Sequence, residues 1–187
     1  MSSKVLLVNP PFYRFLGSHY NANSLGIAYI ASYLNKNGHD AWVYNADYLN
    51  QFDYAELREL FDRFDNYIQY FKNINAPIWE EVSQKIIDFK PEWVGYTSYT
   101  ANISAIDIIS SKVKKMNPQV KQVIGGVHAT LDGLVLGSVQ DIDFAIRREG
   151  EEALLALVEG LDPLMISGVI SREGAAFCKN GDAEVIK

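Results

Sequence analysis

The sequence has almost no cysteine. Cys178 is the only one among 187 residues, so the chain cannot close a disulfide within itself. It also lacks the paired cysteines of a zinc site and the three cysteines needed to hold an iron–sulfur cluster. Structural zinc and iron–sulfur chemistry are therefore excluded for this chain alone.

Positive charge and long apolar runs are also scarce. Lys and Arg number 17 against 23 Asp and Glu, the net charge is −6, and no dense basic cluster occurs. Because phosphate neutralisation supplies most of the affinity for nucleic acids, we expect no nucleic-acid partner. No apolar segment approaches the roughly 18 residues of a membrane-spanning helix, and the N-terminus lacks the pattern of a signal peptide. We therefore expect a cytoplasmic protein without a membrane span.

Motifs that cradle phosphates are missing from the expected place. The loop after the first apolar run reads Asn9-Pro10-Pro11-Phe12-Tyr13, with neither a dinucleotide-binding fingerprint nor a P-loop. Its prolines have no N–H to donate to a phosphate. The three histidines are scattered, so we predict no catalytic residue and no metal ligand. A flavin- or nucleotide-binding module stays open as an alternative.

Short apolar runs alternate with helical periodicity along most of the chain. The runs predict strands at residues 4–8, 41–44, 93–96, 120–124, 144–146 and 166–170. Between them, stripes at i, i+3, i+4 and i+7 predict amphipathic helices, with two helices in residues 50–90 in place of one. This order predicts a flavodoxin-like (Rossmann-like) α/β fold, a doubly wound parallel sheet of about five strands with helices on both faces. Turn residues at Arg172-Glu173-Gly174 and Asn180-Gly181 predict a C-terminal hairpin.

The carboxyl ends of the predicted strands carry unusual residues. In a sheet of order 2-1-3-4-5 the ends of strands 1, 3, 4 and 5 border one edge, where ligands of such folds bind. Gly125-Gly126 directly follows an apolar run, which marks a backbone that something bulky approaches closely. Small hydroxyl residues follow strand 3, and together these ends suit a large, mostly neutral ligand with a nucleotide tail.

Some charged and polar residues at these ends have two interpretations. Asp47 either binds a polar group of a ligand or caps the next segment. His128 either lines the pocket or makes structural hydrogen bonds. Glu149 is a candidate for function, whereas helix capping alone explains Glu151 and Glu152.

Five segments, in this order, resemble the N-terminal cobalamin-binding domain of cobalamin-dependent radical SAM (iron–sulfur oxidoreductase-like) enzymes. They are residues 4–11, residues 25–34 with Gly38-His39, Gly95-Tyr96-Thr97-Ser98-Tyr99-Thr100, Gly125-Gly126-Val127-His128-Ala129-Thr130, and Glu149-Gly150-Glu151. Thr97 and Tyr99 stand where the family's SxL…GG pattern has serine and leucine.

The resemblance implies cobalamin (vitamin B12) as the cofactor of this chain. The predicted cofactor-binding residues are Asn9, Pro10, Leu25, Gly26, Asp47, Thr97, Ser98, Tyr99, Thr100, Gly125, Gly126, His128, Ala129, Thr130, Glu149 and Gly150. The DxHxxG motif that places a histidine on cobalt is absent from Asn9 through Gly26, so no cobalt ligand is assigned.

The resemblance also implies a partner. The CxxxCxxC motif that binds a 4Fe–4S cluster and S-adenosylmethionine is absent, so both would belong to a radical SAM catalytic domain in cis that is missing here. We accordingly expect a cobalamin-binding domain over residues 1–165, with an insertion at about 50–90, and a strand and hairpin over 166–187 leading toward that domain. The function implied is to present the corrin for methyl transfer or radical chemistry. The alternatives are a stand-alone corrinoid carrier and a ligand-free interaction module.

Overall fold

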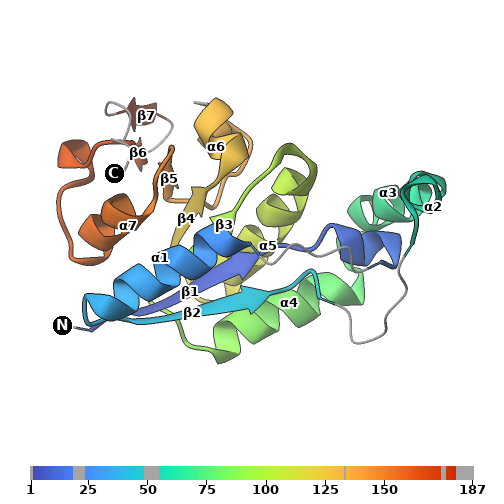
Figure 1. The fold of residues 1–187 in the computed structure, drawn as a ribbon, viewed down its shortest axis with the longest axis horizontal. Coiled ribbons are helices and arrows are strands. Elements are labelled where there is room, and N and C mark those ends of the chain that lie inside the picture. The colour runs from blue at the N-terminus through green and yellow to red at the C-terminus, as the bar shows by residue number, and fades with distance from the viewer. Residues whose placement is uncertain (1, 19–23, 49–54, 133, 174–175, 180–187) are drawn as a thin grey trace.

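A computed structural model gives the structure of the chain and describes residues 2–18, 24–48, 55–132, 134–173 and 176–179. These residues form one seven-stranded sheet of order β2-β1-β3-β4-β5-β6-β7 (Figure 1). The strands are β1 (Lys4–Asn9), β2 (Asp40–Asn45), β3 (Trp93–Thr97), β4 (Lys121–Gly125), β5 (Phe144–Ile146), β6 (Val169–Glu173) and β7 (Ala176–Lys179). Strands β1 to β5 are parallel and β6 and β7 antiparallel, which confirms the flavodoxin-like fold with a C-terminal hairpin. The predicted turn residues Gly174 and Asn180-Gly181 lie outside the described residues.

Helices cover both faces of the sheet. The α-helices are α1 (Leu25–Lys36), α2 (Leu57–Asp62), α3 (Phe64–Lys72), α4 (Pro77–Asp88), α5 (Ile103–Met116), α6 (Val127–Leu131) and α7 (Glu151–Val158). Short 3₁₀ turns are η1 (Tyr13–Leu16), η2 (Thr100–Asn102), η3 (Val135–Gly137) and η4 (Pro163–Met165). Helices α1 and α7 pack together on one face, and α4 and α5 on the other (Figure 1).

Two hydrophobic cores result, one for each face. Ile27, Ala31 and Leu34 recur at helical spacing on α1 and are buried against β1, β4 and α7. On the opposite face, the side chains of α4 and α5 pack over β1, β3 and β4. The central strands are buried on both faces, which is why they read as continuous apolar runs in the sequence.

The inserted segment differs in detail from its prediction. One helical stripe over residues 57–71 becomes two helices, because the chain breaks at Arg63 between α2 and α3. The Arg63 guanidinium donates hydrogen bonds to the carbonyls of Leu16 (3.3 Å) and Gly17 (3.1 Å), which ties this break to the loop after β1. Helix α4 begins with Pro77 as predicted and serves as the ordinary crossover helix. The added part is therefore α2 and α3, which lie beyond the ends of β1 and β2 (Figure 1).

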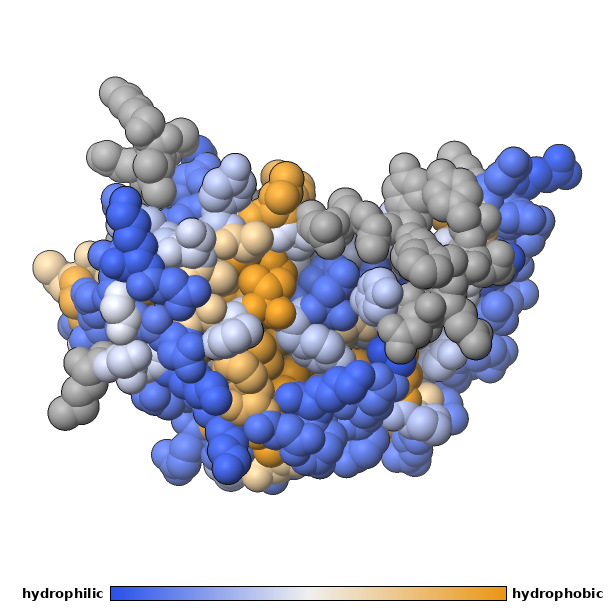
Figure 2. Space-filling model, turned by 60° about the horizontal axis from the view of Figure 1, so that its bottom comes forward, coloured by the Kyte–Doolittle hydropathy of each residue, from blue (hydrophilic) through white to orange (hydrophobic). Residues whose placement is uncertain are grey.

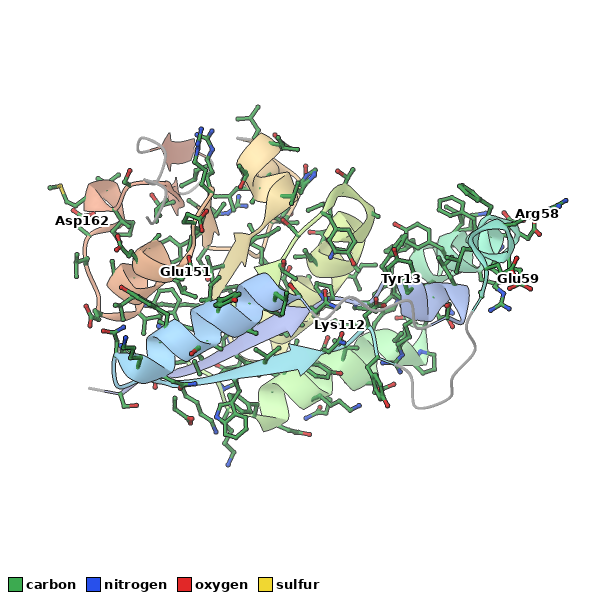
Figure 3. All side chains as sticks on the ribbon, viewed as in Figure 1. Tyr13, Arg58, Glu59, Lys112, Glu151 and Asp162 are labelled. Carbon is green, nitrogen blue, oxygen red and sulfur yellow. The ribbon has the colours of Figure 1, made fainter. Side chains whose placement is uncertain are left out.

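Aromatic side chains hold α3 to the body of the domain. Phe15 of η1 is buried, and its ring lies 4.7 Å from Tyr70, 5.5 Å from Phe71 and 5.1 Å from Trp79, measured between ring centroids. Figure 3 shows Tyr13 at η1, on the side of α2 and α3, whereas Glu151 at the start of α7 lies on the other side of the molecule. The strand ends therefore have an aromatic cluster with η1 and α3 on one side and helix α7 on the other.

Candidate functional site

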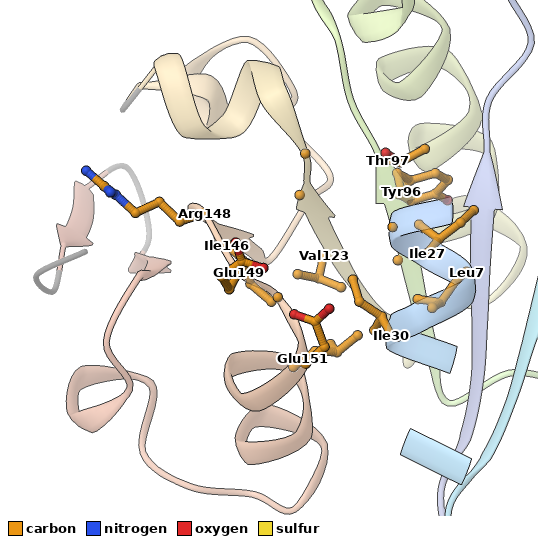
Figure 4. Close-up of a pocket in the computed structure, with 16 residues that line it drawn as sticks. Leu7, Ile27, Ile30, Tyr96, Thr97, Val123, Ile146, Arg148, Glu149 and Glu151 are labelled. Carbon is orange, nitrogen blue, oxygen red and sulfur yellow. The ribbon is translucent and has the colours of Figure 1, made fainter. Parts of the chain in front are cut away.

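A cavity of about 160 Å³ opens at the carboxyl ends of the parallel strands, on the face covered by α1 and α7 (Figure 4). Its lining has three chemical parts. Five glycines contribute backbone only: Gly26, Gly95, Gly125, Gly126 and Gly150. Aliphatic walls come from Leu7, Ile27, Ile30, Val123, Ile146 and Leu154, and the remaining lining residues are Tyr96, Thr97, Arg148, Glu149 and Glu151. The cavity is thus largely apolar, with a few polar groups at its margin.

The floor of the cavity exists because residue 95 is glycine. Gly95 lies in β3, directly between Leu7 of β1 and Val123 of β4 in the sheet register. A Cβ at this position would lie 2.6 Å from Leu7 Cδ2 and 3.5 Å from Val123 Cγ1. A side chain here would therefore occupy the space between these two walls. A glycine inside a strand marks such a close approach, and this signal was available in the sequence but was not used to place Gly95 in the site.

The two adjacent glycines have different roles. Gly126 has φ +98° and ψ −168°, and a Cβ there would lie 2.8 Å from the Ser98 carbonyl oxygen and 2.9 Å from the Ser98 nitrogen. Its close approach is thus to the protein's own backbone. A Cβ on Gly125 would meet only the Ile146 carbonyl oxygen, at 3.8 Å. Gly125 is on the same strand face as Val123, so its missing side chain leaves the cavity open.

Ser98 joins the ends of β3 and β4. Both its backbone N–H and its hydroxyl donate to the Gly125 carbonyl, each at 2.7 Å. The Ser98 carbonyl accepts from His128 N–H at 3.1 Å, and its hydroxyl oxygen accepts from Ala129 N–H at 3.3 Å. Ser98 is fully buried. It holds the glycine pair in place and does not line the cavity.

Thr100, His128 and Thr130 make further links between these ends. His128 Nδ1 lies 3.2 Å from Thr100 Oγ1, and His128 Nε2 lies 3.7 Å from Asp132 Oδ2. The Thr130 hydroxyl donates to the Gly126 carbonyl at 3.0 Å and accepts from Arg148 N–H at 2.9 Å. These residues, with Ala129, brace the wall around the glycines and lie outside the cavity lining.

Four of the predicted residues lie apart from the cavity lining, near the ends of β1 and β2. They are Asn9, Pro10, Asp47 and Tyr99. Asn9 Nδ2 donates to Asn45 Oδ1 at 2.9 Å, and Pro10 is buried. Tyr99 lies edge-on to Phe12 with ring centroids 6.1 Å apart, and burial raises the pKa of its phenol. Leu25 is exposed beside Gly26 at the start of α1. Of the predicted residues, Gly26, Thr97, Gly125, Gly126, Glu149 and Gly150 come together around the cavity.

Asp47 pins the loop after β1. Its carboxylate Oδ1 accepts from Phe12 N–H at 2.6 Å and from Arg14 N–H at 2.9 Å. The side chain is buried, and burial raises the pKa of the carboxyl from its ordinary 3.8 to about 6, although these N–H groups lower it. Asp47 therefore caps η1 in the loop after β1, and not the segment that follows Asp47 in the sequence, as the capping interpretation had it.

This raised pKa predicts a pH-dependent stability. The folded state binds the Asp47 proton more tightly than the unfolded state, so its contribution is full below pH 3.8 and is lost as the pH rises through about 6. A shift of this size corresponds to about 3 kcal/mol of unfolding free energy. Asp47→Asn keeps an oxygen acceptor for both N–H groups and removes the titration. Urea unfolding of both proteins from pH 7 to pH 4 should show the wild type gaining on the variant; a constant difference would contradict this.

The structure adds residues to the site that sequence reasoning had missed. Besides Gly95, they include Ile27 and Ile30 of α1, Arg148, and Glu151, which had been assigned to helix capping alone. Figure 4 shows the Arg148 side chain pointing away from the cavity and the Glu151 carboxyl group turned toward Val123 and Ile30. Oε2 of Glu151 is buried and has no hydrogen-bond partner in the described structure.

The described part of the chain lacks two further features. No helix in it is both long and apolar enough to cross a lipid bilayer. No cluster of three or more His, Cys, Asp and Glu side chains in it has the arrangement to hold a metal ion.

The parallel sheet of order 2-1-3-4-5 and a cavity at its carboxyl edge define a flavodoxin-like ligand-binding domain. The family model for the B12 binding domain matches residues 17–158, which is more than half of the chain. The protein therefore belongs to the B12-binding domain family.

Curated relatives match a shorter part of the chain. It is 36% identical over 84 residues to the anaerobic magnesium-protoporphyrin IX monomethyl ester cyclase of Rubrivivax gelatinosus, and 31% identical over 84 residues to the same enzyme of Cereibacter sphaeroides. Each match covers 44% of this chain, and 15% and 14% of the respective relative. The chain thus corresponds to a small part of these enzymes.

Solved structures confirm the fold. The radical S-adenosylmethionine methyltransferase TsrM of Kitasatospora setae, with tryptophan substrate and a SAM analog bound, has a TM-score of 0.67 at 18% identity, over 98% of this chain and 31% of that one. The same enzyme with cobalamin and a [4Fe-4S] cluster bound has a TM-score of 0.66 at 18% identity, over 100% and 30% of the two chains. In these neighbours the matching fold is part of a longer chain.

Proposed function

We propose that this chain binds cobalamin, with the base of the nucleotide tail in the cavity and the corrin ring over the carboxyl ends of the strands. The observation that carries the proposal is the glycine-floored cavity within a domain of the B12-binding family. An apolar protein cavity of about 150 Å³ accommodates one benzene ring. A cavity of about 160 Å³ therefore suits one flat base and excludes a whole corrin.

The residues that line the cavity fit the flat base of a nucleotide tail. Gly95 and Gly125 provide a cradle that side chains would fill, and Leu7, Ile27 and Val123 supply apolar contact for the faces of a ring. Thr97 places a hydroxyl group in the lining where the tail would enter. These residues would bind and orient the tail and exclude water from it.

The surface around the strand ends suits the flat part of the cofactor. Large exposed apolar side chains there include Leu25 at the start of α1 and Val127 and Leu131 on α6. Figure 2 shows hydrophobic residues in a band across the middle of one face, flanked by hydrophilic residues. Contiguous exposed apolar surface of this kind marks a binding site for a ligand or a protein.

We further propose that the domain presents the corrin to a radical SAM catalytic domain of a longer protein. Bound cobalamin supplies methyl transfer or radical chemistry, and the cluster and S-adenosylmethionine would be held by the catalytic domain. Support comes from the two curated relatives and the two solved structures described above, each of which is much longer than this chain.

Cobalamin binding is tested directly by its visible spectrum. Purified protein is incubated with hydroxocobalamin and desalted, and we expect corrin absorbance to stay with the protein. A folded protein, checked by circular dichroism, that retains no corrin would overturn the proposal for this chain alone. Bound flavin would instead give blue-light absorption and fluorescence, which distinguishes the flavin alternative.

One observation also favours an interaction role. Phe61 on α2 and Phe64 on α3 are exposed on the inserted helices, the segment for which the sequence left a protein interface open. This role is compatible with cofactor binding, because a catalytic domain in cis would need a surface on which to pack.

A further inference from the structure

Among the polar residues of the cavity lining in the described structure, Glu151 has a buried side-chain oxygen without a hydrogen-bond partner. It is the first residue of α7 and is partly buried, and its neighbours in the lining include Ile30, Val123 and Leu154. Figure 4 shows its carboxyl group turned toward the aliphatic walls. A purely structural wall residue at this position would be aliphatic.

The carboxyl group is not satisfied by the described protein. Oε2 is buried and has no hydrogen-bond partner. A buried acceptor without a partner is unfavourable, and more so when the group is charged. Oε2 has almost no exposed surface, so it meets a donor in the cavity only after rotation about the last torsion of the side chain, which is soft in glutamate.

Helix charge alone does not account for this orientation. A carboxylate in the first turn of α7 is favourable because of the helix dipole, but the neighbouring Glu152 provides the same charge while exposed to solvent. Glu151 differs from Glu152 in being directed into the cavity. Substituting Glu151 and Glu152 one at a time therefore distinguishes the effect of a charge at the helix N-terminus from the effect of a hydrogen-bond acceptor in the cavity.

We propose that Glu151 selects the base of the corrinoid tail and favours a base that carries a hydrogen-bond donor. This inference rests on the proposed function. An adenine base presents an exocyclic amine that can donate to the carboxylate, whereas dimethylbenzimidazole presents methyl groups and a ring nitrogen that only accepts. Specificity arises because only the donor-bearing base satisfies the buried oxygen.

The test compares three corrinoids on the same protein: hydroxocobalamin, the cobamide with adenine in place of dimethylbenzimidazole, and cobinamide, which has no base. Dissociation constants are measured from the visible spectrum. We expect the adenine-bearing cobamide to bind about tenfold more tightly than hydroxocobalamin, the gain from one charge-assisted hydrogen bond, and cobinamide to bind weakest.

Variants then assign the preference to one side chain. Glu151→Leu should reverse it, because an apolar wall suits the methyl groups of dimethylbenzimidazole, and Glu151→Gln should reduce it while keeping the size of the side chain. Glu152→Leu is the matched control and should keep the wild-type preference. Circular dichroism confirms that each variant folds.

Each outcome has one meaning. Equal affinity for the two complete corrinoids, or a preference that survives in Glu151→Leu, overturns the inference and leaves cobalamin binding in place. Cobinamide binding as tightly as both complete corrinoids overturns the placement of the base in the cavity, and the inference with it. No binding of any corrinoid by the folded protein overturns the proposed function itself.

Discussion

Gly125→Leu should abolish corrin retention while leaving the domain folded. The new side chain starts on the cavity face of β4, where a Cβ meets only the Ile146 carbonyl at an ordinary 3.8 Å, and extends into the space proposed for the base. Excluding a ring removes apolar burial on the order of 100 Å², worth about 2.5 kcal/mol. The affinity for hydroxocobalamin should therefore fall about 50-fold or more. The measurement is a spectroscopic titration of the variant against the wild type.

Ala28→Leu is the matched control for this variant. Ala28 lies on the exposed side of α1, so it adds similar bulk outside the cavity. It should bind hydroxocobalamin as the wild type does. If Gly125→Leu retains the corrin equally well, the base does not lie at this position and the cavity loses its proposed role.

Gly126→Ala should lower the stability of the folded domain. Its φ of +98° with ψ of −168° is a conformation that essentially only glycine adopts, and forcing another residue into it costs about 1–3 kcal/mol. The added Cβ would also press against the Ser98 backbone, at 2.8 Å and 2.9 Å, where no flexible side chain can move aside. Overpacking adds about 1–3 kcal/mol, so we expect a total loss of about 3 kcal/mol or more in urea unfolding.

Gly26→Ala is the corresponding control, since it makes the same chemical change in the first turn of α1. A Cβ there meets nothing within 4 Å, and alanine is the better helix former by about 1 kcal/mol. Gly26→Ala should therefore be at least as stable as the wild type. A Gly126→Ala protein of wild-type stability would mean that the backbone at 126 is free to adopt another conformation.

The sequence predicted the architecture well because periodicity reports burial, and burial depends mainly on which face of an element meets the sheet. The runs of β1, β3 and β4 are buried on both faces, so their apolar stretches were unambiguous. The break at Arg63 was not predictable, because it depends on hydrogen bonds to the carbonyls of Leu16 and Gly17, far away in the sequence.

The site was predicted less completely, for a related reason. The Gly125-Gly126 pair indicated that another group approaches the backbone closely. The sequence did not show that, at Gly126, this group is the backbone of Ser98. Gly95 was missed because its role appears only when β1 and β4 are placed on either side of it. Glu151 had an adequate explanation in helix capping, and only its unpartnered oxygen inside the fold suggests another role.

The cavity walls also belong to a core of the domain. Leu7, Ile27, Val123, Ile146 and Leu154 are members of the buried cluster beneath α1 and α7. A ring lodged among them would pack as a core side chain does, and without it these residues lack part of their contacts. Cofactor loading and thermal stability would then be linked by mass action: the domain should melt at a higher temperature as the free cofactor concentration rises above its dissociation constant. A bound cofactor would thus complete the packing of this hydrophobic core with a group that is not part of the chain.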